Sequence, residues 1–170
     1  LDPLFQQIAY HAKKYTCEVL EYKDIFDYVI TKSWLSRSRR TTDELMWHIH
    51  STSHISFVYY VNIPPNSHVL EFENICTQND LFKTMNSEGD TPDRTMVENY
   101  NPLNSERFYI SPIEGSVVMF PSSLPHNTKF KGDNFKGERL GIVGDITLML
   151  KEDQLHYSMG YIDNKYWKKY

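Results

Sequence analysis

Three histidines and one arginine are the residues of this chain best suited to chemistry. His48 and His50 stand one residue apart, His126 lies in the sequence FPSSLPH, and Arg139 follows it by thirteen positions. Because a strand turns alternate side chains to the same face, His48 and His50 are expected to point the same way. A further histidine from a neighbouring strand could complete a metal site open to substrate, and imidazole suits iron, zinc, copper and nickel.

The chain is rich enough in histidine for a His-x-His pair to occur without a metal site. Seven histidines occur in 170 residues, so a His-x-His pair can also come from surface or hydrogen-bonded core residues that bind no metal. The context of His48 and His50 favours the metal site, because they open an apolar, β-rich run that reads HIHSTSHISFVYYVNIP.

The segment ERLGIVGDITLML, which contains Arg139, alternates in character. One face of a strand here is expected to be core, because the even positions are apolar at Leu140, Ile142, Ile146, Leu148 and Leu150. The odd positions are polar or smaller, at Arg139, Gly141, Val143, Asp145 and Thr147. The other face places the guanidinium of Arg139 beside Gly141. A rigid planar fork beside open space suits bidentate binding of a carboxylate, and an ordinary arginine at a sheet edge is the alternative.

Two short helices and seven strands are expected to position these residues. Residues 3–14 and 22–32 carry apolar stripes at helical spacing. Strand-like runs follow near residues 44–50, 55–63, 68–73, 107–110, 116–120, 126–130 and 138–150, with turn residues between them. Many short strands with such turns indicate a β-sandwich or barrel, with the helices outside one sheet.

One domain is expected to span residues 1–170. It would comprise a helical region over residues 1–33, a β core over 44–150 and a C-terminal arm over 151–170. The polar segment 74–106 inside the core is either a flap over a site or plain disorder. The arm is expected to pack on the domain or on a partner subunit, and the second alternative would make a homodimer.

The composition of the chain argues against several classes of binding partner. The net charge of −4 argues against a nucleic-acid partner, because such proteins usually carry a basic patch. The two cysteines, Cys17 and Cys76, make no disulfide framework and no cysteine-rich metal motif, and they indicate free thiols in a cytoplasmic compartment. The sequence shows neither a membrane-length apolar run nor a signal peptide, so no membrane partner is expected, although a segment before Leu1 could be missing.

Three motifs in one order resemble a known family. WHIH followed by HISFVYYVNIP, then PIEGSVVMFPSSLPH, then ERLGIVGDI are together similar to the iron(II)- and 2-oxoglutarate-dependent oxygenases. The likeness is greatest to the small oxygenases of marine bacteria and their phages, and it covers roughly residues 45 to 150. Each motif is weak alone, and their order and spacing carry the resemblance.

The resemblance implies a mainly β fold with N-terminal helices, formed as a double-stranded β-helix or jelly-roll barrel with iron near its mouth. It implies an enzyme that uses Fe(II) and 2-oxoglutarate to hydroxylate a small-molecule or peptide substrate. His48 would be the first iron ligand and His126 the distal one, and Arg139 would hold the far carboxylate of 2-oxoglutarate. Tyr59 or Tyr60 would add a hydroxyl group to the co-substrate.

The sequence departs from the family pattern at two positions. Gly141 stands where family members often carry serine, and His50 stands where the carboxylate ligand is expected. Either His50 is itself a ligand in a three-histidine site, or it lies behind the ligands and a water or another carboxylate, such as Glu71, completes the set. His54 is a weaker candidate ligand.

Two other functions compete with the oxygenase. One is a metal-binding cupin enzyme that does not use 2-oxoglutarate, which His-x-His suits better than Arg139 does. The other is a non-catalytic jelly-roll module with a binding or structural role. Metal content and affinity for 2-oxoglutarate separate the three.

Overall fold

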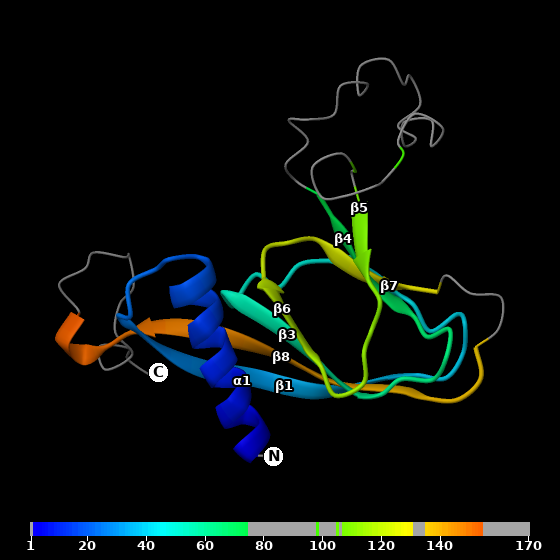
Figure 1. The fold of residues 1–170 in the computed structure, drawn as a ribbon, viewed down its shortest axis with the longest axis horizontal. Coiled ribbons are helices and arrows are strands. Elements are labelled where there is room, and N and C mark those ends of the chain that lie inside the picture. Colours follow the sequence, from blue (N-terminus) through cyan, green and yellow to red (C-terminus); the bar gives the residue numbers. More distant parts are fainter. Residues whose placement is uncertain (1, 75–97, 99–104, 106, 131–134, 155–170) are drawn as a thin grey trace, which may run out of the picture.

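The fold is built on two four-stranded antiparallel sheets that face each other (Figure 1). A computed structural model describes residues 2–74, 98, 105, 107–130 and 135–154. The elements in chain order are helix α1 (Asp2–Lys14), π-helix η1 (Tyr15–Val19), strands β1 (Phe26–Ser38), β2 (Leu45–His48), β3 (Ile55–Asn62), β4 (Val69–Glu73), β5 (Arg107–Ile110), β6 (Val117–Pro121), β7 (His126–Lys129) and β8 (Arg139–Leu150), and 3₁₀-helix η4 (Glu152–Gln154).

The chain passes repeatedly between the sheets. The first sheet has the strand order β1-β8-β3-β6 and the second has the order β2-β7-β4-β5. Every strand pair is antiparallel. Closing two sheets over one apolar layer in this way is the jelly-roll solution to burying sheet faces, and it confirms the double-stranded β-helix expected from the sequence.

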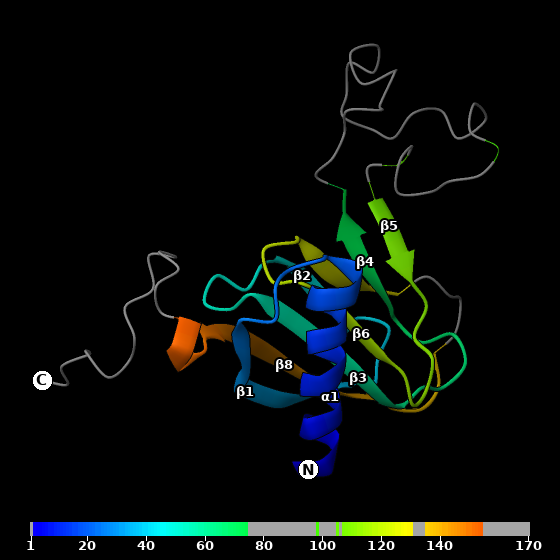
Figure 2. The ribbon, with the colours of Figure 1, turned by 60° about the vertical axis from the view of Figure 1, so that its left-hand side comes forward.

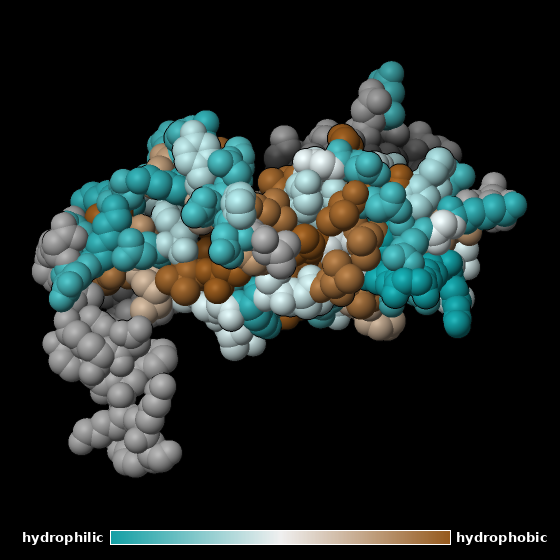
Figure 3. All heavy atoms as spheres, turned by 90° about the horizontal axis from the view of Figure 1, so that it is seen from below, coloured by the Kyte–Doolittle hydropathy of each residue, from teal (hydrophilic) through white to brown (hydrophobic). Residues whose placement is uncertain are grey.

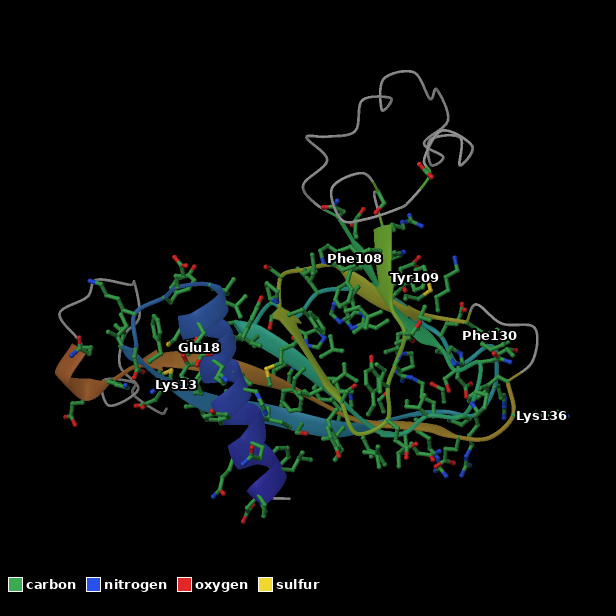
Figure 4. The ribbon with its side chains drawn as sticks, in the orientation of Figure 1. Lys13, Glu18, Phe108, Tyr109, Phe130 and Lys136 are labelled. Carbon is green, nitrogen blue, oxygen red and sulfur yellow. The ribbon has the colours of Figure 1, made fainter. Side chains whose placement is uncertain are left out.

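Two apolar clusters hold the layers together. Helix α1 lies across the outer face of the first sheet (Figure 2) and places Ile8 and Ala12, four residues apart on one helix face, against Phe57 and Ile146. The second cluster lies between the sheets, where it joins side chains of β3, β4 and β6, namely Val58, Tyr60, Leu70, Phe72 and Phe120. Phe108, which is labelled on β5 in Figure 4, packs beside this cluster. Its ring stacks on Phe72 with 5.1 Å between ring centroids.

The register between β3 and β8 decides which side chains enter the space between the sheets. The inward pairs are Ser56 with Asp145, Val58 with Val143, and Tyr60 with Gly141. The outward pair Phe57 and Gly144 is close, since a Cβ on Gly144 would lie 2.6 Å from Cζ of Phe57. Glycine at position 144 therefore allows the ring of Phe57 to lie flat on β8 beneath α1.

Helix α1 covers the outer face of the first sheet only in part. Leu35 of β1 pairs with Ile142 and remains 60% exposed. Seen from below, apolar side chains gather between two polar ends of the molecule (Figure 3). Within the described residues, no helix combines the length and apolar character needed to cross a membrane.

The seven strands expected after residue 44 are confirmed as β2 to β8, and the helix over 3–14 is confirmed as α1. The helix expected over 22–32 is wrong, because the chain from Phe26 onward forms β1. The N-terminal part expected to be helical over residues 1–33 is therefore helical only as far as Val19. Phe26, Tyr28 and Ile30 alternate with more exposed residues and pair with the long strand β8. The pairing of β1 with β8 outweighs the helical spacing. Most of the flap 74–106 and of the arm 151–170 lies outside the described residues.

Candidate metal centre

The second sheet and the loop after β2 bring three histidines together. His48 at the end of β2 pairs directly with His126 at the start of β7, and His50 lies two residues beyond His48. The ring centroids of His48 and His126 are 4.3 Å apart, and that of His50 is 5.2 Å from each. One ring nitrogen from each of the three lies within 4.8 Å of the others, which is close enough for one metal ion.

Each of the three rings is held through its Nδ1 atom. His48 Nδ1 donates to the carbonyl oxygen of Met46 at 2.7 Å, and His126 Nδ1 donates to that of Leu124 at 2.9 Å. His50 Nδ1 donates to Oδ1 of Asp145 at 2.5 Å. Because these oxygens only accept, the neutral form of each ring carries its hydrogen on Nδ1 and its lone pair on Nε2. Metal-binding histidines are commonly held in this way.

The surroundings of His126 keep its imidazole neutral. Burial lowers the pKa of His126 to about 4, although the hydrogen bond to the Leu124 carbonyl acts in the opposite direction. The rings of Phe120 and Phe72 lie 4.7 Å and 6.2 Å from it and supply this apolar environment. A neutral imidazole at pH 7 has the free lone pair that a metal ligand needs.

Acidification is expected to destabilise the metal-free protein through His126. Its pKa falls from an ordinary 6.5 to about 4 in the fold, so the unfolded chain binds more protons between these values and stability drops as the pH falls through that window. Urea unfolding of the metal-free protein at pH 7 and 5 measures the drop. His126→Gln should show a smaller drop than the wild-type protein, and an equal drop in both would contradict this origin.

A buried carboxylate that sequence reasoning did not select lies behind His50. Asp145 is fully buried on the inward face of β8, where Ser56 Oγ donates to its Oδ1 at 2.9 Å. Lys32 Nζ lies 3.0 Å from its Oδ2. Burial raises the pKa of Asp145, but the hydrogen bond from His50, the ion pair with Lys32 and the hydrogen bond from Ser56 outweigh this and lower it overall. In the sequence, the sign that could have pointed to Asp145 was an acidic residue at an odd position of the β8 segment, whose even positions are mostly apolar.

A second polar group lies on the inward side of β8. Arg139 is 1% exposed, and its guanidinium carbon lies 5.3 Å from the ring centroid of Tyr60. Burial lowers the pKa of Arg139 and raises that of Tyr60. Arg139 Nε and the Tyr60 hydroxyl are buried without a well-formed hydrogen bond. A buried cation with an unused donor is a suitable partner for an anionic ligand.

Tyr59 and Gly141, the other two residues predicted to line the co-substrate site, are less favourably placed than Tyr60 and Arg139. Tyr59 pairs with Ile142 on the outward face of β3, so only Tyr60 approaches Arg139. Gly141 leaves less open space than expected, since a Cβ there would lie 3.2 Å from the carbonyl oxygen of Tyr59.

Glu71 and His54 are placed where they do not join the three histidines. Glu71 accepts a hydrogen bond from Asn127, whereas the next residue, Phe72, pairs with His126, so Glu71 faces away from the site. Nδ1 of His54 accepts a hydrogen bond from the backbone of Leu148. The described groups able to hold a metal comprise the three histidines alone.

Comparison with known proteins assigns the fold to a family. The family model described as "Putative 2OG-Fe(II) oxygenase" matches residues 32–145, which is more than half of the chain. A solved oxidoreductase of the 2OG-Fe(II) oxygenase family from Burkholderia pseudomallei is 11% identical with a TM-score of 0.50, over 79% of this chain and 50% of that one. A Pseudomonas putida prolyl-4-hydroxylase is 14% identical with a TM-score of 0.42, over 79% of this chain and 60% of that one.

The chain thus spans half or somewhat more of the length of these solved structures. A search of curated proteins finds no match. The residues matched by the family model include the three clustered histidines and Arg139. The chain belongs to the family of 2OG-Fe(II) oxygenases.

Proposed function

We propose that the protein is an iron(II)- and 2-oxoglutarate-dependent oxygenase that hydroxylates its substrate. The observation that carries the proposal is the convergence of three imidazoles, each oriented through Nδ1 so that Nε2 is left for a metal. Family membership supports the choice of iron, with which imidazole ligands are compatible.

The residues fit the iron that the family implies. His48, His50 and His126 would hold it, and the carbonyl groups of Met46 and Leu124 fix two of these rings before a metal arrives. Iron would supply activation of dioxygen, coupled to oxidative decarboxylation of 2-oxoglutarate. The protein would orient the substrate and exclude water, and the ring of Phe120 beside His126 is suited to excluding water.

The group around Arg139 fits the co-substrate. Its buried guanidinium would pair with the far carboxylate of 2-oxoglutarate, and Tyr60 would add a hydroxyl group. An anion at this position would offset the cost of burying the charge, which the ring of Tyr60 offsets only in part.

Anaerobic titration with Fe(II) and then 2-oxoglutarate tests the proposal. The wild-type protein should bind one Fe(II), and 2-oxoglutarate should then produce the weak visible charge-transfer band of an iron chelate. Metal binding without affinity for 2-oxoglutarate would favour a cupin enzyme of another kind. A protein that binds neither would favour a non-catalytic jelly-roll module.

His50 is expected to be a ligand, because its Nδ1 is held by Asp145 as firmly as the other two rings are held. His50→Ala should therefore cost as much Fe(II) affinity as His48→Ala, measured by anaerobic competition with a chelator. A loss of only about 10–100-fold would instead place His50 behind the ligands. In that case, His50→Asp would tighten iron binding by supplying the carboxylate that the family usually carries there.

We further propose a small-molecule or peptide substrate and a cytoplasmic location, with no nucleic-acid partner. The net charge of −4 and the presence of only two cysteines support these proposals. A screen of small acids and peptides for substrate-dependent consumption of 2-oxoglutarate tests the substrate class.

A further inference from the structure

We propose that Asp145 is a positioning residue that supplies the metal site with its negative charge through His50. The proposal rests on the proposed function only in requiring that the three histidines bind a metal. It would explain how a site with no carboxylate among its three candidate ligands retains an anion next to the ion.

The contact between Asp145 and His50 has the geometry for this role. Oδ1 of Asp145 lies 2.5 Å from His50 Nδ1, and their side chains are 0% and 7% exposed. A carboxylate that accepts this hydrogen bond makes the imidazole a stronger electron donor at Nε2 and fixes the plane of the ring. Burial strengthens the effect, because water screens a buried pair far less than an exposed one.

A network of hydroxyl groups holds the carboxylate in place. Ser56 Oγ lies 2.9 Å from Asp145 Oδ1, 3.1 Å from His50 Nδ1 and 2.9 Å from Ser122 Oγ. Ser53 donates to Ser122 at 2.9 Å and extends the network. Ser56 and Ser122 are fully buried, so the carboxylate has a fixed position relative to the ring.

Lys32 shares the charge of Asp145 from the opposite side. Its Nζ lies 3.0 Å from Oδ2 of Asp145, and the Lys32 side chain is 53% exposed. The same ammonium group lies 5.6 Å from the ring centroid of Trp34, which is itself 5.9 Å from that of His50. Removing the ammonium group should leave more of the Asp145 charge available to His50, whereas removing the carboxylate should leave none.

Titration with Co²⁺ alone tests the inference. Asp145→Asn keeps the size of the side chain and removes its charge, and it should weaken Co²⁺ binding by about 10–100-fold. Lys32→Met should tighten binding by a smaller factor. The visible absorption bands of bound Co²⁺ should shift in Asp145→Asn relative to the wild-type protein. Glu71→Gln is the matched control, since it neutralises a buried carboxylate that faces away from the site and should leave Co²⁺ binding unchanged.

The outcomes separate this inference from the proposed function. Equal Co²⁺ affinity and equal spectra in Asp145→Asn and Glu71→Gln would overturn the role of Asp145 and leave the oxygenase proposal standing. If the variants change Co²⁺ binding as expected but the wild-type protein never binds 2-oxoglutarate, the result would support the role of Asp145 and overturn the oxygenase proposal. If Asp145→Asn does not fold, Lys32→Met decides, and unchanged or weaker binding in that variant would reject the inference. A wild-type protein that binds no Co²⁺ would overturn both.

Discussion

Replacing His48 or His126 with alanine is expected to abolish stoichiometric Fe(II) binding while the domain stays folded. The two residues pair across β2 and β7 and present one free nitrogen each, so removal of either leaves too few ligands for a stable site. Iron content after anaerobic loading and desalting measures the effect, and circular dichroism confirms the fold. His11→Ala, on the exposed side of α1, is the matched control and should retain iron.

Wild-type iron content in both variants would reject the assignment of these ligands. The described metal-binding groups offer three ring nitrogens within 4.8 Å and no further ligand, so loss of one histidine should strongly reduce iron binding. The alanine at position 126 also removes a ring that packs on Phe120, so a lower unfolding midpoint is expected for that variant.

Replacing Arg139 with alanine is expected to weaken 2-oxoglutarate binding by about 2–5 kcal/mol, or some tens- to thousands-fold, because a charge-assisted bidentate pair in a buried place is lost. Iron binding should survive, since Arg139 is not one of the three described residues that could hold the metal. Equilibrium titration of the iron-loaded protein with 2-oxoglutarate measures the loss.

Arg107→Ala is the matched control for this experiment. The guanidinium of Arg107 lies over the ring of Trp47 at 5.1 Å, and its side chain is exposed. Its loss should leave the affinity for 2-oxoglutarate unchanged. Arg139→Met, which keeps the bulk of the buried stem, guards against a folding defect in the alanine variant. Undiminished affinity in a folded Arg139 variant would assign Arg139 a structural role.

Strands β2 to β8 could be predicted, because turn residues separate the strand-like runs in which they lie. The proximity of His48 and His126 agrees with the shared metal site that the resemblance to the oxygenases predicted for them. The first strand could not be predicted in this way. Its apolar residues satisfy a helical stripe as well as an alternating pattern, and only pairing with β8 decides between them.

Asp145 shows why a portion of the site escaped prediction. Its distance from His50 is 95 positions in the chain, and the contact depends on the register in which β8 pairs with β3. A shift of one residue would turn Asp145 to the outer face and Gly144 inward. The alternation along β8 indicates which of its residues share a face, but not that Ser56 of β3 lies beside Asp145. By the same alternation, Tyr59 and Tyr60 lie on opposite faces of β3.

The three histidines are anchored to different sheets, which has a consequence for the domain as a whole. His48 and His126 belong to the second sheet, whereas His50 is tied through Asp145 to β8 of the first. A metal ion held by all three would act as a cross-link between the halves of the sandwich. Folding and metal uptake would then be thermodynamically linked, with about 2.7 kcal/mol of added stability when free metal is a hundred times its dissociation constant. Loss of the metal would in this way lower the free energy of unfolding of the domain as well as remove its activity.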